Sequence, residues 1–208
     1  MTLIIGIKCS NGVVLGADGA ATLGSMGQPT VRQPVKKLTV LEDKVIVGVS
    51  GWVGLGQRIQ SEIEGLWKAG ELLPQQEQPA GQFTAIFTTQ AQPTQRAPRT
   101  PEEAMVVIRH RIGEHCVSEL RYAGDVMKAT GQAFPLESAL AATLVAFPFG
   151  NIPCLVQFDQ QGAPELATVD LPFITIGSGR GNADSFLAFL RRIFWGNAPP
   201  ALADGLFA

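Results

Sequence analysis

The first eighteen residues carry the sequence feature that most constrains the fold. Residues 2–9 and 13–18 are rich in β-branched and other apolar residues, and the turn-forming residues 10–12, Ser-Asn-Gly, separate them. Two extended runs joined by such a short turn are typical of a tight β-hairpin. The chain should therefore begin with a strand that belongs to the core of the fold.

The register of this hairpin decides which residue faces Thr2. A turn centred on residues 10 and 11 places Gly19 opposite Thr2, whereas a turn centred one residue later places Ala21 there. In both registers Asp18 lies close to Thr2, and it lies closer in the first.

The rest of the chain alternates between strand and helix patterns. Residues 19–34 are expected to form a loose connection, and residues 74–99 form a Gln- and Pro-rich excursion with one short strand at 83–88. Thr100, Pro101 and Glu103 are typical of a helix start with a capping box. Apolar periodicity predicts helices over 52–70 and from 101 to before Gly131, a third helix capped by Asn182, and strands at 35–41, 44–49, 139–147, 153–159 and 166–176.

This order favours one α+β domain over residues 1–208. Hairpins followed by two helices, more strands and a helix suit a layered sandwich better than βαβ crossovers. The chain has 16% charged residues, well below the roughly 25% of an ordinary soluble domain. Because no apolar run is long enough to span a membrane, we expect other copies of the chain to cover part of its surface.

Charge and cysteine content exclude several classes of function. A net charge of −2 without a basic cluster disfavours nucleic-acid binding. The three cysteines lack the spacing of a zinc site or a disulfide framework. The N-terminus lacks the features of a secretory signal, so a cytoplasmic location is expected. No metal or cofactor is predicted.

Common catalytic motifs are also missing. The glycine loop at 177–181 lacks the Lys-Ser/Thr of a phosphate-binding P-loop. His110 and His115 are five residues apart, so they do not share the helix face that a zinc-binding pair needs. Ser178 lies in Gly-Ser-Gly and not in the Gly-x-Ser-x-Gly elbow of a serine hydrolase.

The N-terminus itself offers a nucleophile. If Met1 is removed, Thr2 carries a hydroxyl group and a free α-amine, whose unperturbed pKa of roughly 8 allows it to act as a base. Asp18 is expected nearby, and either Lys36 or Lys37 should point inward, because neighbouring strand residues face opposite ways. An inward lysine needs a carboxylate partner.

The front half of the chain resembles a proteasome β-subunit. The resemblance rests on TLIIGIK at residues 2–8, NGVVLGAD at 11–18, AT at 21–22, KKL at 36–38 and VSGWVG at 49–54, with GSG at 177–179 further on. It is strongest toward the bacterial β-type proteasome homologues, relatives of HslV and Anbu, among the N-terminal-nucleophile hydrolases. It implies a four-layer αββα sandwich.

The resemblance also implies a self-compartmentalising threonine peptidase. Thr2 would be both nucleophile and base, Asp18 and Lys37 its electrostatic partners, the Gly51 N–H the oxyanion donor and Ser178 a support for the amine. An apolar substrate pocket would be lined by Ala21, Val35, Thr39, Val49 and Val53. Substrates would be peptides or unfolded proteins, and the assembly two stacked rings of seven subunits, or of six. The sequence does not specify a regulatory ATPase.

Two departures from the family pattern leave alternatives open. The family brings an Asp and a Ser to the threonine from elements after its third helix, and no matching Asp and Ser pair is found in residues 197–208, so the C-terminal part looks incomplete. The excursion at 74–99 is longer than the usual link between the first two helices. An inactive ring-forming homologue and an amidase acting on small amides are therefore the alternatives.

Overall fold

The protein was analysed as a computed structural model that describes residues 2–23, 31–74, 98–131 and 140–208. The strands are β1 (Ile4–Cys9), β2 (Gly12–Ala17), β3 (Ala20–Leu23), β4 (Val31–Pro34), β5 (Leu38–Leu41), β6 (Val45–Gly51), β7 (Ala141–Phe149), β8 (Ile152–Phe158), β9 (Pro164–Leu166) and β10 (Phe173–Ile176). The helices are α1 (Val53–Lys68), α2 (Pro101–Thr130), α3 (Arg180–Leu190), the π-helix η2 (Arg191–Trp195) and α4 (Leu202–Phe207).

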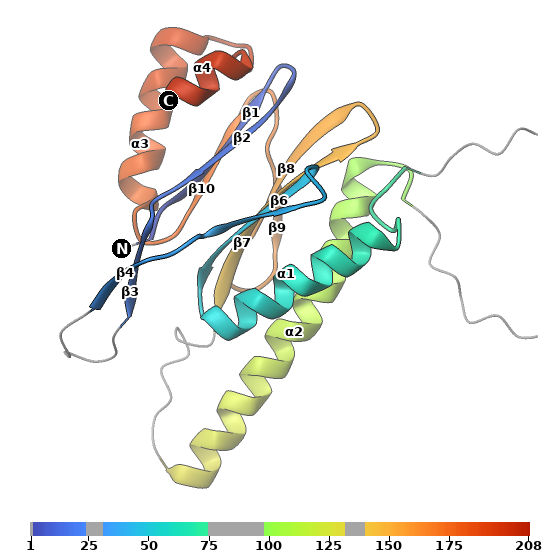
Figure 1. Ribbon diagram of the computed structural model, residues 1–208, viewed down its shortest axis with the longest axis vertical. Helices are drawn as coiled ribbons and strands as arrows, with labels where there is room; N and C mark the ends of the chain where they lie inside the picture. Colours follow the sequence, from blue (N-terminus) through green and yellow to red (C-terminus); the bar gives the residue numbers. More distant parts are fainter. Residues whose placement is uncertain (1, 24–30, 75–97, 132–139) are drawn as a thin grey trace, which may run out of the picture.

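Two antiparallel sheets form the centre of the molecule. One has the order β10-β1-β2 and the other β5-β6-β7-β8-β9, while β3 and β4 pair separately as a hairpin. Helices α1 and α2 lie on the side of the five-stranded sheet, and α3 and α4 on the opposite side of the molecule, next to β1, β2 and β10 (Figure 1). The predicted α+β class with layered sheets and helices is confirmed.

Three apolar clusters hold these layers together. The largest fills the space between the five-stranded sheet and helices α1 and α2, and includes Val47, Ile59, Ile108, Val145 and Phe158. A second lies between the two sheets and includes Ile4, Leu144, Leu155, Ile174 and Ile176. A third packs α3 and η2 against the outer face of the three-stranded sheet through Ile7, Cys9, Phe173, Leu187 and Trp195. Strand β1 therefore has a packed layer on each face.

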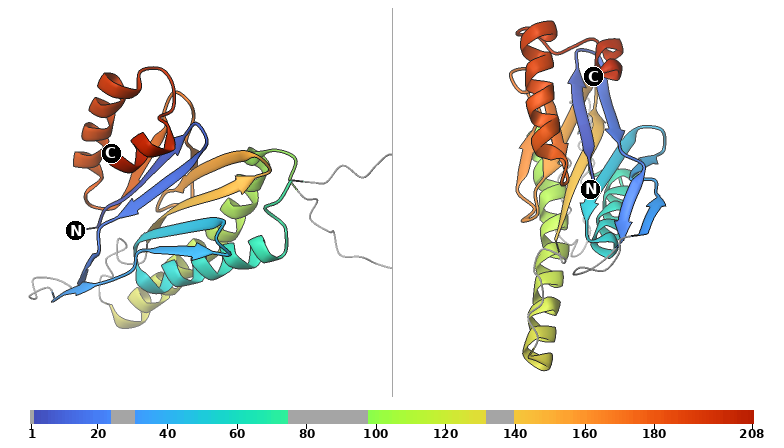
Figure 2. Two further views of the ribbon diagram at one scale, coloured as in Figure 1. Left: turned by 45° about the horizontal axis from the view of Figure 1, so that its top comes forward. Right: turned by 90° about the vertical axis from the view of Figure 1, so that its left-hand side faces the viewer.

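Helix α2 follows the sequence signals at both ends. Thr100 accepts a hydrogen bond from the Glu103 N–H at 3.3 Å, Pro101 occupies the first turn, and Gly131 ends the helix with a left-handed φ of 66°. The expected capping box is shifted by one residue, because the Glu103 carboxylate accepts from the N–H of Arg99. The C-terminal half of α2 extends beyond the sheets (Figures 1 and 2). No helix within the described ranges is long and apolar enough to cross a membrane.

Four sequence expectations need correction. The connection 19–34 contains the β3–β4 hairpin, and the third expected strand begins at Leu38 and not at residue 35. Of the single strand expected at 166–176, only Leu166, the last residue of β9, and the residues of β10 are strand, because the chain leaves the five-stranded sheet after β9 and enters the other sheet at β10. Helix α3 begins at Arg180 after Gly179, so Asn182 is inside it and is not its cap. The strand expected at 83–88 lies outside the described residues.

The three cysteines are free and buried, and burial is the main cause that raises the pKa of each thiol above its ordinary value. We therefore expect slow alkylation of Cys9, Cys116 and Cys154 by iodoacetamide at pH 8, with fast alkylation in urea. Because the unfolded thiols release their protons first, folding stability should fall as the pH rises above about 8.5. Mass spectrometry of the alkylated protein tests the first expectation, and rapid labelling of the folded chain would contradict it. Urea denaturation at several pH values tests the second.

Candidate active site

The first hairpin brings Asp18 to the start of β1. Cys9 pairs with Gly12 and Ile4 with Ala17, so the turn is centred on residues 10 and 11, the first of the two predicted registers. The N–H of Asp18 donates to the Leu3 carbonyl at 3.1 Å. The Leu3 N–H in turn donates to Asp18 Oδ1 at 2.6 Å, a contact that sequence patterns did not indicate.

Lys37 is the inward-pointing member of the lysine pair. Its Nζ donates to Asp18 Oδ1 at 2.7 Å and to Thr2 Oγ1 at 3.5 Å. The Lys37 side chain is 7% exposed and that of Asp18 29%, whereas Lys36 is exposed to solvent. A nearly buried ammonium group needs a charged partner, and Asp18 provides it. The result is a positive charge held beside the Thr2 hydroxyl.

The glycine loop after β10 holds the backbone of Thr2. Ser178 Oγ accepts a hydrogen bond from the Thr2 N–H at 2.9 Å, and the Gly179 N–H donates to the Thr2 carbonyl at 3.0 Å. Gly177 has a φ of 98°, and a Cβ built there would lie 2.3 Å from the Thr2 carbonyl oxygen. Only glycine can therefore bring this loop so close to β1.

Gly177→Ala should destabilise the protein and the site together. The left-handed backbone and the contact with the Thr2 carbonyl predict a loss of at least about 2 kcal/mol of unfolding free energy. Gly181→Ala is the matched control, because Gly181 lies in α3 with open space where the added methyl group would lie, and it should stabilise the fold slightly. Urea denaturation measures both variants, and equal stabilities would refute the close approach.

Gly51 ends β6 next to the glycine loop. Its φ is 122°, and a Cβ there would lie 2.3 Å from the carbonyl oxygen of Leu140, which also accepts the Trp52 N–H at 3.0 Å. The neighbouring Ser50 Oγ is 3.2 Å from the position that a Cβ of Gly177 would take. The end of β6 and the Ser178 loop thus meet on the same side of the molecule as Thr2.

The residues expected to line a substrate pocket differ in how far they are buried. Thr39 and Val49 are partly buried on the face of the five-stranded sheet that α1 covers, and a Cβ on Gly56 of α1 would lie 2.8 Å from Val49 Cγ1. Val35 is 39% exposed and Val53, the first residue of α1, 64% exposed. The side chain of Ala21 lies outside the described residues.

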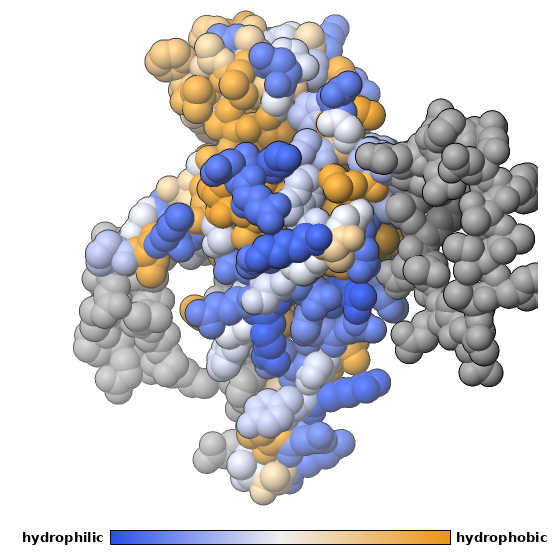
Figure 3. Space-filling model, turned by 45° about the vertical axis from the view of Figure 1, so that its right-hand side comes forward, coloured by the Kyte–Doolittle hydropathy of each residue, from blue (hydrophilic) through white to orange (hydrophobic). Residues whose placement is uncertain are grey.

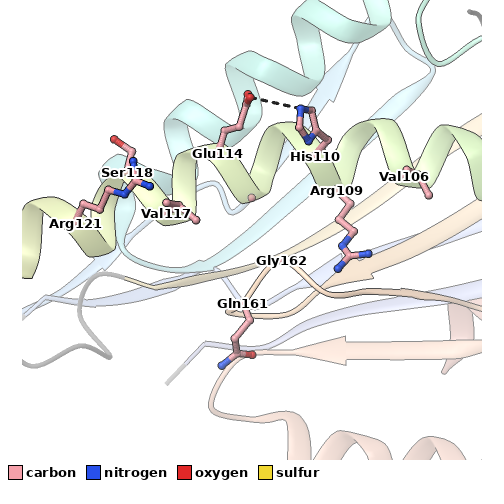
Figure 4. Close-up of a pocket in the computed structure, with 10 residues that line it drawn as sticks. Val106, Arg109, His110, Glu114, Val117, Ser118, Arg121, Gln161 and Gly162 are labelled. Atoms are coloured by element: carbon pink, nitrogen blue, oxygen red, sulfur yellow. Dashed lines mark ion pairs between the residues drawn. The ribbon is translucent and has the colours of Figure 1, made fainter. Parts of the chain in front are cut away.

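A groove in the described part of the chain lies away from these residues. It measures about 850 Å³ and runs along α2 beside Gln161 and Gly162 (Figure 4). None of the predicted catalytic residues lines it. His110 lies in this groove, exposed and 3.5 Å from Glu114, while His115 contacts Glu62 at 3.4 Å. In the parts of the chain that the structure covers, no group of three His, Cys, Asp or Glu residues could hold a metal ion.

Comparisons with known proteins agree with this architecture. The structure is similar to the Anbu (Gly-1) mutant from Hyphomicrobium sp. strain MC1, with a TM-score of 0.59 and 15% identity, covering 100% of this chain and 70% of that one. Anbu (ancestral beta-subunit) from Yersinia bercovieri gives 0.55 at 15% identity, covering 98% and 70%. The helical assembly of the Anbu complex from Pseudomonas aeruginosa gives 0.56 at 12% identity, covering 99% and 70%. At identities this low, the TM-scores show a shared fold and nothing about function.

The sequence comparisons identify the family. No curated protein matches the sequence. The model of the proteasome subunit family matches residues 2–134, which include Thr2, Asp18, Lys37 and Gly51 and cover more than half of the chain. The chain therefore belongs to the proteasome subunit family.

Proposed function

We propose that this protein is a threonine peptidase of the proteasome β type that hydrolyses peptide bonds. The observation that carries the proposal is that Thr2 contacts polar side chains from two distant parts of the chain, Lys37 and Ser178, and that Asp18 binds the first of them. Lys37 lies beside its hydroxyl group, Asp18 holds Lys37, and Ser178 accepts its N–H. Membership of the proteasome family supports the same assignment.

The proposed reaction begins after Met1 has been removed. Thr2 Oγ1 attacks the scissile carbonyl carbon while its proton passes to the Thr2 amine through water. The N–H of Gly51 stabilises the oxyanion, and the positive charge of Lys37 favours the developing negative charge on Oγ1. The peptide C–N bond then breaks, the leaving amine takes the proton, and water hydrolyses the ester on Thr2.

Mass spectrometry tests the nucleophile directly. The intact mass of purified native protein shows whether Met1 is removed, and incubation with a peptide epoxyketone followed by peptide mapping shows which residue reacts. The proposal requires a trimmed chain with the adduct on Thr2. A chain that retains Met1 throughout and forms no adduct would instead support an inactive ring-forming homologue.

We assign residues 1–208 to a single domain with the αββα layering of N-terminal-nucleophile hydrolases. The support is that helices pack against both outer faces of the two sheets, while the sheets share an apolar core with each other. The catalytic residues we propose lie at β1, at the end of β2, before β5, at the end of β6 and after β10. Neither helical layer supplies one of them.

Neutral apolar residues are the expected preference on the acyl side of the cleaved bond. Val35, Thr39, Val49, Val53 and Ala21 carry no charge, so a charged substrate side chain would lose hydration there without a partner. Short fluorogenic peptides ending in Leu should be cleaved at least about tenfold faster than matched peptides ending in Arg or Glu. A preference for Arg or Glu would refute this pocket. Turnover of a small amide but of no peptide would favour the amidase alternative.

We also propose that the protein is a homo-oligomer, with two stacked rings of seven subunits as the expected form. The support is an exposed apolar surface on the C-terminal helices (Figure 3). Its most exposed members are Phe194 at 71%, Leu206 at 69% and Phe207 at 93%. Contiguous exposed apolar surface is typical of protein–protein contact sites. Light scattering after size exclusion tests the proposal, and a monomer at micromolar concentration would overturn it.

A further inference from the structure

One carboxylate joins both ends of the loop that carries Ser178. Thr175 lies in β10, two residues before the loop, and its hydroxyl group donates to Asp184 Oδ1. Arg180 follows the loop directly, and its Nε donates to Asp184 Oδ2 at 3.0 Å. Asp184 itself lies one turn further along α3. The two oxygens of a single side chain therefore bind the residues on either side of the loop.

The end of the loop that follows Thr175 is attached to the protein interior. Thr175 is 1% exposed and pairs with Ile5 of the central strand β1. Its side chain points to the face of the sheet that α3 covers, because the neighbouring Ile174 and Ile176 belong to the cluster between the sheets. A buried hydroxyl group requires a hydrogen-bond partner, and Asp184 provides it from α3.

The side at Arg180 starts the helix. Gly179, which precedes it, is the N-cap of α3 and has no side chain to cap the free N–H groups. The Arg180 N–H instead donates to the Gly177 carbonyl at 3.1 Å, which closes the turn. Asp184 thus binds both ends of the loop, Thr175 through a buried hydroxyl group and Arg180 through a half-exposed ion pair.

We propose that Asp184 is a positioning residue for the reaction at Thr2. It acts through Ser178: by holding Thr175 and Arg180, it keeps Ser178 Oγ within hydrogen-bond distance of the Thr2 nitrogen. This inference rests on the proposed function for its effect on catalysis. The contact between the loop and β1 exists without any reaction, so it can be measured separately.

A double-mutant cycle separates positioning from simple stabilisation of α3. The rate of Thr2 modification by the epoxyketone is measured for Asp184→Ala, Ser178→Ala and the double variant. We expect each single variant to react about tenfold more slowly, and the double variant to react no more slowly than Ser178→Ala. If the fold-losses in rate of the two single variants multiply in the double variant, Asp184 does not act through Ser178. An unchanged rate in Asp184→Ala would also overturn the proposal.

Two further variants control for folding. Ser185→Ala removes a neighbouring hydrogen bond on the same helix, from Ser185 Oγ to the Gly181 carbonyl, and should react at the wild-type rate. If Asp184→Ala does not fold, Thr175→Val removes only the buried hydroxyl group at nearly constant shape, and the same cycle is run with it. A wild-type rate in folded Thr175→Val would refute the role of this contact.

Hydrogen exchange tests the contact without the reaction. The Gly179 N–H, which binds the Thr2 carbonyl, should exchange at least about tenfold faster in Asp184→Ala or Thr175→Val than in Ser185→Ala. If the wild type forms no adduct but exchange changes as expected, the proposed function fails and the positioning contact stands. If exchange is the same in all variants, the positioning proposal fails.

Discussion

Thr2→Ala is expected to reduce peptide hydrolysis to the uncatalysed background, a loss on the order of 10³-fold or more. In the proposed reaction Thr2 supplies the attacking oxygen, which alanine lacks. Its side chain makes a long contact with Lys37 Nζ, at 3.5 Å, while its backbone is held by Ser178 and Gly179. The variant should therefore fold and assemble like the wild type, as circular dichroism and light scattering would show.

Thr2→Ser is the matched control for this result. Serine keeps the hydroxyl group and the free amine after removal of Met1, so measurable turnover of the Leu-ending fluorogenic peptide should remain. Both variants should be trimmed, because alanine and serine are also small. If trimmed Thr2→Ala still forms the epoxyketone adduct, the nucleophile is another residue.

Lys37→Met is expected to lower the rate of Thr2 modification on the order of 10²- to 10³-fold. The substitution keeps the length of the side chain and removes the only charge that contacts Thr2 Oγ1 among the contacts the structure describes. Asp18 keeps its hydrogen bond from the Leu3 N–H and is 29% exposed to solvent, so it retains a partner and contact with water when Lys37 is replaced. The main effect should therefore be on reactivity and not on folding.

Lys36→Met provides the comparison for Lys37→Met. It changes the same residue type by the same substitution one position earlier, where the lysine is exposed. Its rate of Thr2 modification should equal that of the wild type at constant ionic strength. Similar losses in both variants would mean that net charge, and not the position of Lys37, determines the reactivity of Thr2.

Local signals predicted the parts of the fold that local chemistry determines. The first hairpin follows from its short turn, although the sequence left two registers open and the structure has the first of them. Residues 42 and 43, between the strands expected at 35–41 and 44–49, form a turn in which Glu42 and Asp43 have positive φ angles of 48° and 54°. The break between β9 and β10 was missed, because residues 166–176 remain largely apolar while the chain crosses from one sheet to the other. Which sheet a strand joins depends on packing that no short window contains.

The same distinction applies to the site. The hairpin places Asp18 near Thr2, and the strand pattern predicts that one of two lysines points inward. The family resemblance selected Lys37 and added Gly51 and Ser178. The contact of Thr175 and Arg180 with Asp184 could not be predicted, because it joins a strand to a helix. A threonine in an apolar strand and an acidic residue one turn after an arginine are each ordinary features of a sequence.

The central position of β1 has a consequence for the order of events during synthesis. Strand β1 ends at Cys9, whereas β10, one of its two neighbours, begins only at Phe173, so β1 leaves the ribosome long before this partner. The partners of Thr2 appear in the order Asp18, Lys37 and finally Ser178. An incomplete nascent chain therefore lacks the Ser178 contact and the strand that completes the sheet around β1. The chain must be made at least as far as Ser178 before all these contacts can exist, which would delay the formation of the proposed peptidase site.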